Sequence, residues 1–164
     1  MNAAHGAMTI IDSGSPALTS HSGVSVQMPN RPVDSTLSPC DRPTILLIED
    51  DAAVRESLAL LLDTRGFRVL TAENGQRGLA IFRRQSPSVV VTDIMMPEQD
   101  GIGTMLQMQR ERPDVKIIAI SGGGRVDKAD YLSIAEKLGA VAAFEKTQVN
   151  ALIEMLETML KSRP

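Results

Sequence analysis

Short runs of aliphatic residues alternate with amphipathic segments along the chain from residue 43 onward. Each run has five or six residues between turn-forming or polar residues, which is typical of a strand buried in a parallel sheet. Strands are therefore predicted at residues 44–48, 67–71, 88–92, 115–120 and 140–144. Apolar residues at helical spacing predict helices at residues 52–65, after Asn74, and at 102–111, 127–138 and 148–161. This alternation predicts an α/β fold, a doubly wound five-stranded parallel sheet with five helices and right-handed crossovers.

Local signals mark several of the helix ends. Gly66 and Gly139 each follow a helical pattern directly, where glycine commonly ends a helix. Asn74 suits the N-cap of the second helix, because its side-chain oxygen can accept from a backbone N–H of the first turn. These boundaries therefore have a chemical cause that the sequence itself shows.

Residues 1–42 differ in composition from the rest of the chain. They are rich in Ser, Thr, Pro and Gly, carry few charges and contain no aromatic residue. Such a segment buries too little apolar surface to offset the entropy of ordering, so a disordered N-terminal extension is predicted before a domain at residues 43–164. His5, His21 and Cys40 all lie in the extension. Catalysis by Ser-His or Cys-His pairs, histidine-ligated zinc and histidine phosphotransfer are thereby excluded for the predicted domain.

The composition narrows the function classes further. The formal net charge is −3 and no run is rich in Lys and Arg, which argues against a nucleic-acid surface. No window approaches the roughly 18 to 20 consecutive apolar residues that a membrane span needs, and the N-terminus lacks the pattern of a secretory signal. The single cysteine cannot form an internal disulfide, which fits a reducing compartment. A cytoplasmic protein that binds neither nucleic acid nor membrane is expected.

Acidic residues directly follow two of the predicted strands. Glu49 and Asp50 come after residues 44–48, and Asp93 comes after residues 88–92. The carboxyl ends of parallel strands line one crevice, so these carboxylates should converge, with the ammonium group of Lys146 close by. Carboxylates 4 Å apart repel by roughly 4 kcal/mol near a protein surface. The cluster therefore indicates a hard divalent cation beside a phosphoryl acceptor.

The same residues have simpler interpretations. Glu49, Asp50 and Asp51 could form the solvated start of a helix, where acids favour the positive end of the dipole. Asp93 could cap a turn at the end of its strand, and a surface lysine such as Lys146 is usually just solvated. The acids taken alone leave the metal site and the helix start equally open.

Four motifs carry a resemblance to a known family. ILLIEDD is followed about forty residues later by DIMMPEQDG, then by IIAISGG and FEK. In this order and spacing they resemble the receiver domain of bacterial response regulators, over essentially all of residues 43–164. The resemblance implies a flavodoxin-like sheet with strand order 2-1-3-4-5. Because the chain ends after the fifth predicted helix, a stand-alone receiver is expected.

The resemblance implies a role for each residue of the site. Asp93 would be the phosphoacceptor, Lys146 would pair with the phosphoryl oxygens, and the Ser121 hydroxyl would donate to one of them. Mg²⁺ would be the cofactor, held by oxygen ligands from Glu49, Asp50, Asp93 and the backbone carbonyl of Met95. The donor would be a sensor histidine kinase or a histidine phosphotransfer protein. The domain would be a monomer or weak dimer, not a conventional turnover enzyme, and would signal by altered protein binding.

Three positions depart from the pattern of the family. Thr147 stands where a proline is usual, often after a cis peptide; a cis bond before another residue costs about 2.5–4 kcal/mol, so a trans or strained bond is expected. Ala143 stands where the family has a switch aromatic, so signalling through a rotating ring is not expected. Residues 122–124 are all glycine. Phosphorylation is therefore expected to order residues 121–126 and to shift the following helix, with Tyr131 on the changed face.

Other functions are compatible with the predicted fold. A pseudo-receiver, which binds partners without phosphorylation, stays open as an alternative because of the three departures. A hydrolase with an aspartyl-phosphate intermediate generally needs a second Asp two residues after the nucleophile, where this chain has Met95. A flavin-binding module is disfavoured because acids, which repel phosphate, follow the first strand.

Overall fold

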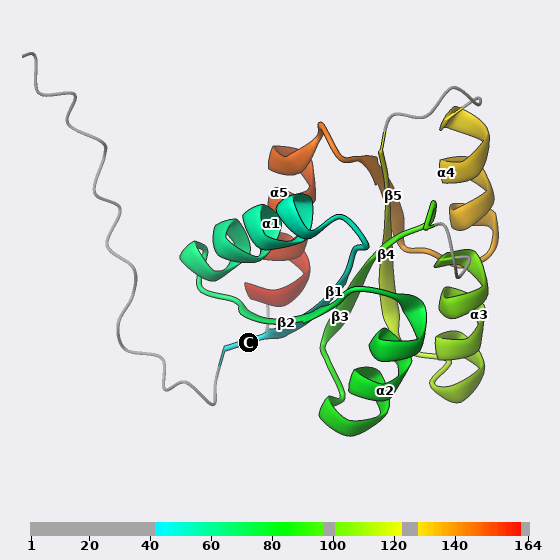
Figure 1. Ribbon diagram of the computed structural model, residues 1–164, viewed down its shortest axis with the longest axis horizontal. Coiled ribbons are helices and arrows are strands. Elements are labelled where there is room, and N and C mark those ends of the chain that lie inside the picture. Colours follow the sequence, from blue (N-terminus) through cyan, green and yellow to red (C-terminus); the bar gives the residue numbers. More distant parts are fainter. Residues whose placement is uncertain (1–41, 97–100, 123–127, 162–164) are drawn as a thin grey trace, which may run out of the picture. The chain divides into compact units, whose positions relative to one another are not determined.

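The five strands form one parallel sheet in the order β2-β1-β3-β4-β5 (Figure 1). The computed structural model describes residues 42–96, 101–122 and 128–161, with only the backbone described for residues 128–131 and 161. The strands are β1 Thr44–Ile48, β2 Arg68–Ala72, β3 Val89–Asp93, β4 Lys116–Ser121 and β5 Ala142–Glu145. The helices are α1 Ala52–Thr64, α2 Gly75–Gln85, α3 Gly101–Glu111, α4 Lys128–Lys137 and α5 Val149–Lys161. The predicted fold class and sheet order are confirmed.

Helices cover both faces of the sheet, with α1 and α5 on one face and α2, α3 and α4 on the other (Figure 1). Side chains of a strand alternate between the two faces, so each strand contributes to two separate apolar clusters. In β1, Leu46 and Ile48 belong to the cluster under α2, α3 and α4, whereas Ile45 and Leu47 belong to the cluster under α1 and α5. Burying one such side chain fully stabilises the fold by about 1.5–3 kcal/mol. Burial on both faces explains why the strands read as continuous aliphatic runs.

The two predicted glycine stops end their helices with the same geometry. Gly66 has a φ of 87° and Gly139 a φ of 102°, which is the left-handed region. After α1, the N–H of Gly66 donates to the carbonyl of Asp63 at 2.9 Å, and the N–H of Phe67 donates to that of Leu62 at 3.3 Å. These are the two bonds of a Schellman motif, and the buried ring of Phe67 supplies the apolar contact that usually accompanies it.

Three strands, β2, β3 and β4, begin and end one residue later than predicted. Phe67, predicted as the first residue of β2, belongs instead to the turn that closes α1. The aliphatic run alone does not set these limits, because the ladder with the neighbouring strand does. β5, at Ala142–Glu145, begins two residues and ends one residue later than predicted, so it alone is shorter. Because β3 ends one residue later than predicted, Asp93 is its last residue, and it lies opposite Ile120 of β4.

Several expectations fall outside the described residues. They concern the predicted extension apart from Arg42, the glycines at 123 and 124, and the side chain of Tyr131. These expectations stay predictions. Among the described helices the longest have 13 residues, and none has the length and apolar character needed to cross a bilayer.

Candidate functional site

The register of the sheet places Glu49 and Asp93 next to each other at the carboxyl ends of β1 and β3. Ile48 pairs with Thr92 across these strands, so the residue that follows each of them lies at the same edge. The N–H of Glu49 donates to the carbonyl of Ala72 at 3.0 Å, which holds Glu49 in the ladder although β1 has ended. Both acids are buried, Glu49 with 0% and Asp93 with 2% of their surface exposed. Two of the predicted carboxylates therefore meet inside the protein rather than in solvent.

Lys146 reaches the same edge from beyond β4. Ser121 of β4 pairs with Glu145 of β5, and the N–H of Lys146 donates to the carbonyl of Ser121 at 2.9 Å. The ammonium nitrogen of Lys146 lies 2.7 Å from Oδ2 of Asp93. It also lies 2.7 Å from Oε1 and 2.6 Å from Oε2 of Glu49. One cation thus bridges the two buried carboxylates.

The pKa values of these groups depend on one another. Burial raises the pKa of Glu49 above its ordinary value, and the hydrogen bond and charge of Lys146 offset only part of that rise. Burial lowers the pKa of Lys146, but hydrogen bonds and charges from Asp93 and Glu49 outweigh it and raise this pKa overall. The two directions are consistent because a single cation serves two buried anions. Lys146 therefore stays positively charged, whereas burial beside another carboxylate raises the pKa of Glu49.

The carboxylate of Asp93 is fixed at both of its oxygens. While Oδ2 faces Lys146, Oδ1 accepts the N–H of Met95 at 2.8 Å. The simpler interpretation of Asp93, a residue that caps a turn, is therefore true of Oδ1 only. The start of α3 lies against the same residue: a Cβ on Gly101 would come within 2.0 Å of the Asp93 carbonyl oxygen. Glycine at 101 is what permits this close approach.

The three consecutive acids after β1 divide between two roles. Asp51 is the N-cap of α1 and accepts the N–H of Val54 at 3.0 Å, a bond that lowers the pKa of Asp51. Asp50 is exposed, and it can place one carboxylate oxygen within 4.8 Å of oxygens from Glu49 and Asp93. A solvated helix start is therefore the correct interpretation for Asp51 and the wrong one for Glu49.

This donor set fits a hard divalent cation. Carboxylate oxygens are the ligands that Mg²⁺ prefers, and the exposure of Asp50 leaves an open side where the ion can keep several waters. Oε2 of Glu49 is buried and lies 2.6 Å from the ammonium nitrogen of Lys146, so this oxygen has a charged partner without metal. The fit to a metal rests on the grouping of carboxylate oxygens from Glu49, Asp50 and Asp93, which lie within 4.8 Å of one another. That the backbone carbonyl of Met95 is a further ligand stays a prediction.

Ser121 and Gly122 line the site on the side of β4. The Ser121 hydroxyl is buried and donates to the carbonyl of Gly122 at 3.4 Å. The predicted hydrogen bond from this hydroxyl to a phosphoryl oxygen would replace the 3.4 Å contact. That bond stays a prediction. A Cβ on Gly122 would lie 3.3 Å from Cδ of Lys146, so glycine leaves room for the lysine stem to cross the chain here.

The corner between β5 and α5 has no cis peptide at the position where the family usually has proline; all described peptides are trans. Hydrogen bonds from side chains hold this corner instead. The N–H of Glu145 donates to Oε1 of Gln148 at 3.0 Å, and the N–H of Gln148 donates to the Glu145 carbonyl at 2.8 Å. The Thr147 hydroxyl also donates to Oε2 of Glu145, at 3.2 Å. These bonds shape the corner that presents Lys146.

Ala143, at the position of the family's switch aromatic, lies half-buried on β5. It pairs with Ala119 of β4 and packs against the cluster under α2, α3 and α4. The position presents a methyl group rather than a ring, as the sequence shows.

Sequence reasoning missed two residues that contact the site. Arg55 of α1 donates from Nη1 to the backbone carbonyls of Glu49 and Asp50, at 2.7 and 3.2 Å. Gln148 provides the side-chain acceptor of the β5–α5 corner. The only available signal was their place one turn into, or at the first residue of, a predicted helix. Polar residues are too common at such positions for this signal to be diagnostic.

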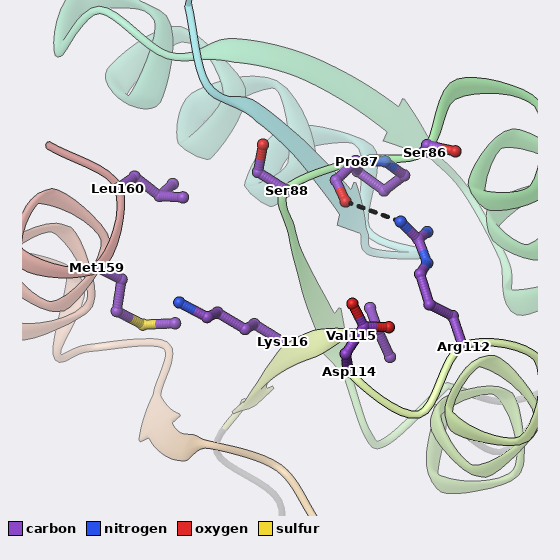
Figure 2. Close-up of a pocket in the computed structure, with 9 residues that line it drawn as sticks. All are labelled: Ser86, Pro87, Ser88, Arg112, Asp114, Val115, Lys116, Met159 and Leu160. Atoms are coloured by element: carbon purple, nitrogen blue, oxygen red, sulfur yellow. Dashed lines mark hydrogen bonds between the residues drawn. The ribbon is translucent and has the colours of Figure 1, made fainter. Parts of the chain in front are cut away.

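A hollow of about 350 Å³ lies at the opposite edge of the sheet (Figure 2). Its lining comes from the segments before β3 and β4 and from the end of α5: Ser86, Pro87, Ser88, Arg112, Asp114, Val115, Lys116, Met159 and Leu160. Arg112 is fixed there, because it donates to the Pro87 carbonyl at 3.4 Å and lies 4.0 Å from the centroid of the Phe82 ring. The hollow lies at the amino ends of β3 and β4, so it adds no group to the acid cluster.

Comparison with known proteins agrees with this geometry. The sequence model of the family described as response regulator receiver domain matches residues 45–157. The probable transcriptional regulator ycf27 of Porphyra purpurea is 38% identical over 110 residues, which cover 66% of this chain and 45% of the relative. The transcriptional regulatory protein AfsQ1 of Streptomyces coelicolor is 44% identical over 68 residues, 42% of this chain and 30% of the relative. The chain spans less than half the length of these curated relatives.

Solved structures share the fold. A response regulator receiver domain protein from Clostridium thermocellum superimposes with a TM-score of 0.65 at 28% identity, over 72% of this chain and 94% of its own. A CheY-like receiver domain protein from Methanospirillum hungatei gives a TM-score of 0.64 at 24% identity, over 73% and 94% of the two chains. The second likeness speaks for the fold alone.

Proposed function

This chain belongs to the receiver domain family of the response regulators of two-component signal transduction, and we propose that it accepts a phosphoryl group on Asp93 in a Mg²⁺-dependent reaction. Family membership sets the reaction class, since receiver domains accept a phosphoryl group on an aspartate. The choice of Asp93 is supported by its place in the DIMMP motif and by the 2.7 Å contact between its Oδ2 atom and Nζ of Lys146. Glu49 makes a similar contact with Lys146, so the motif separates these two acids. Asp50, by contrast, is exposed and makes no ion pair with a described residue.

The proposed transfer forms a bond between a carboxylate oxygen of Asp93 and phosphorus, and breaks the P–N bond of a phosphohistidine. The imidazole leaves with the electron pair of that bond and takes up a proton. Lys146 neutralises the charge that develops on the phosphoryl oxygens. Residues 43–164 contain no histidine, so the phosphohistidine has to come from a partner. A sensor histidine kinase or a histidine phosphotransfer protein is the donor we propose.

Glu49, Asp50, Asp93 and the backbone carbonyl of Met95 would hold the Mg²⁺ ion. When bound, the ion supplies positive charge that offsets the repulsion between the carboxylates and the phosphoryl group. The grouping of carboxylate oxygens from Glu49, Asp50 and Asp93 within 4.8 Å of one another supports this assignment. Ser121 would donate its hydroxyl hydrogen to a phosphoryl oxygen after the transfer.

The proposed output is a change in binding to a downstream protein. The domain then assists its own phosphorylation without acting as a conventional turnover enzyme. The relatives named above are transcriptional regulators more than twice as long as the segment matched here, so the expectations of a stand-alone receiver and of no nucleic-acid contact stay predictions.

Phosphoryl uptake from acetyl phosphate tests the proposal. The chain is incubated with this donor in the presence of Mg²⁺ or of a chelator, and uptake is followed by intact mass and by phosphate-affinity gels. Wild type should gain one phosphoryl group only with Mg²⁺, and Asp93→Asn should gain none. Asp51→Asn is the matched control, because Asp51 is an exposed N-cap and asparagine caps equally well.

A second outcome would favour the pseudo-receiver, which the substitutions at Ala143 and Thr147 keep open. In that case wild type takes up no phosphoryl group from acetyl phosphate or from a panel of phosphorylated histidine kinases. The proposal would also be wrong if Asp93→Asn were labelled as well as wild type.

A further inference from the structure

Arg55 reaches back from α1 to the turn that carries two of the proposed metal ligands. Its Nη1 atom donates to the carbonyl of Glu49 at 2.7 Å and to the carbonyl of Asp50 at 3.2 Å. The backbone N–H of Arg55 donates to the carbonyl of Asp51 at 2.9 Å, in the first turn of the helix. One half-buried residue therefore holds three consecutive carbonyls of the turn between β1 and α1.

The dipole of α1 does not explain this placement. The start of a helix is the positive end of its dipole, where a cation is unfavourable. A guanidinium beside a site for a divalent cation is unfavourable as well. The carbonyls of Glu49 and Asp50 precede the helix and need donors from elsewhere, and the guanidinium supplies one to both. The carboxylates of the turn attract a guanidinium, but the two hydrogen bonds to the carbonyls set where Nη1 of Arg55 lies.

We propose that Arg55 is a positioning residue for the metal site, an inference that rests on the function proposed above. The direction of a carboxylate is set by the backbone on either side of its Cα atom. By holding the carbonyls of Glu49 and Asp50, the guanidinium fixes how both side chains present their oxygens to Mg²⁺. Contacts that orient metal ligands in this way typically change metal affinity by about 10- to 100-fold.

Positioning and charge predict opposite results when Arg55 is replaced by methionine. If Arg55 acted through its charge, removing a cation beside the metal site would tighten Mg²⁺ binding. If Arg55 positions the acids, the same substitution weakens binding. Arg55→Lys separates the two effects again, because lysine keeps the charge but lacks the rigid guanidinium that places Nη1 between the two carbonyls.

Arg77→Met is the matched control. Arg77 lies in the first turn of α2, which begins at the same edge of the sheet as α1. Its guanidinium is exposed and pairs with Glu73 at 3.4 Å. This variant removes the same charge from the same edge without touching the turn after β1.

The experiment is a Mg²⁺ titration of the unphosphorylated full chain, followed by heteronuclear NMR, so no phosphodonor is needed. Arg55→Met and Arg55→Lys should raise the Kd about tenfold, whereas Arg77→Met should change it by less than about twofold. In the acetyl phosphate assay, the two Arg55 variants should need more Mg²⁺ for half-maximal rate and approach the wild-type rate at saturation. Circular dichroism and urea unfolding show that each variant is folded.

Tighter or unchanged Mg²⁺ binding in Arg55→Met would overturn the inference, and so would wild-type affinity in Arg55→Lys. Failure of the proposed function has a different signature. Wild type would then bind Mg²⁺ with the dependence on Arg55 intact, and yet accept no phosphoryl group in the presence of acetyl phosphate.

Discussion

The ammonium nitrogen of Lys146 lies 2.7 Å from Oδ2 of Asp93, although β4 separates the strands from which these two residues come. The contact is made at the edge of the sheet, beyond the carboxyl end of β4. It joins the proposed nucleophile to the cation that would stabilise the transferred group. Several predictions about the site depend on this pair and on the backbone that holds it.

Replacing Lys146 by methionine should slow phosphoryl uptake and destabilise the protein without metal. Loss of a charge aimed at the reacting group typically costs about 10²–10³ in rate. The free energy of unfolding should fall by about 3–5 kcal/mol, because the buried Glu49 and Asp93 lose their cation. Uptake kinetics and urea unfolding measure the two effects.

Mg²⁺ and a second lysine provide the controls for this substitution. Mg²⁺ should restore part of the lost stability in Lys146→Met, since the ion supplies the missing charge. Lys116→Met, an equivalent substitution at the opposite edge of the sheet, should leave the uptake rate unchanged. An uptake rate in Lys146→Met equal to that of wild type would remove Lys146 from the mechanism.

Gly101→Ala should disturb Asp93, whereas Gly78→Ala should not. The new Cβ at 101 would come within 2.0 Å of the Asp93 carbonyl oxygen, and backbone cannot move away cheaply. A loss of about 2–3 kcal/mol in the free energy of unfolding and slower uptake are expected.

The control is Gly78→Ala. At Gly78 the nearest atom is Cδ1 of Ile48, at 2.4 Å, which is the movable end of a side chain. Its change in stability should stay within about 1 kcal/mol, since alanine also favours the helix. Equal losses in the two variants would contradict the argument.

Gln148→Ala should loosen the corner that presents Lys146. The substitution removes the side-chain oxygen that accepts the N–H of Glu145 at 3.0 Å. We expect a loss of about 0.5–1.5 kcal/mol in stability and uptake slowed by up to about tenfold, because the ammonium group is held less well. Thr147→Val is the comparison: its hydroxyl bonds the exposed end of Glu145, so the stability should change by less than about 0.5 kcal/mol. If Thr147→Val slowed uptake more than Gln148→Ala, the hydroxyl rather than the amide would hold the corner.

The ion pair between α2 and α3 should stabilise the protein only above acidic pH. Nε and Nη2 of Arg83 donate to Glu111 at 2.9 and 2.5 Å, and this hydrogen bonding lowers the pKa of Glu111 from its ordinary value of 4.5. A lowered pKa means that the contribution is present above about pH 4.5 and is lost as the pH falls through the folded-state pKa. Glu111→Gln should therefore lower the urea midpoint at neutral pH, with a difference that fades in strong acid and in high salt. In a double-mutant cycle with Arg83→Gln, the two substitutions together should cost less stability at neutral pH than the sum of the single losses. If the midpoint difference of Glu111→Gln persisted in strong acid, the ion pair would be excluded as its cause.

The sequence by itself determined the fold class, the order of the elements and the edge of the sheet where the acids meet. Aliphatic runs read as strands because burial on both faces of a parallel sheet demands apolar side chains. Glu49 and Asp93 follow two such runs, so their meeting is a consequence of parallel register rather than of any long-range detail. Gly66 and Gly139 likewise fixed the ends of their helices through a local backbone preference.

Only the tertiary structure decided how the charges are shared among the acids. Glu49 is fully buried, its neighbour Asp50 is exposed and Asp51 caps a helix, although all three are adjacent acids in the sequence. Lys146 reaches Glu49 across 97 residues of chain. Burial and ion pairing arise from segments that meet only after folding, so no local pattern encodes them. The hydrogen bonds from Arg55 to the carbonyls of Glu49 and Asp50 have the same origin, because they depend on where α1 packs against the sheet.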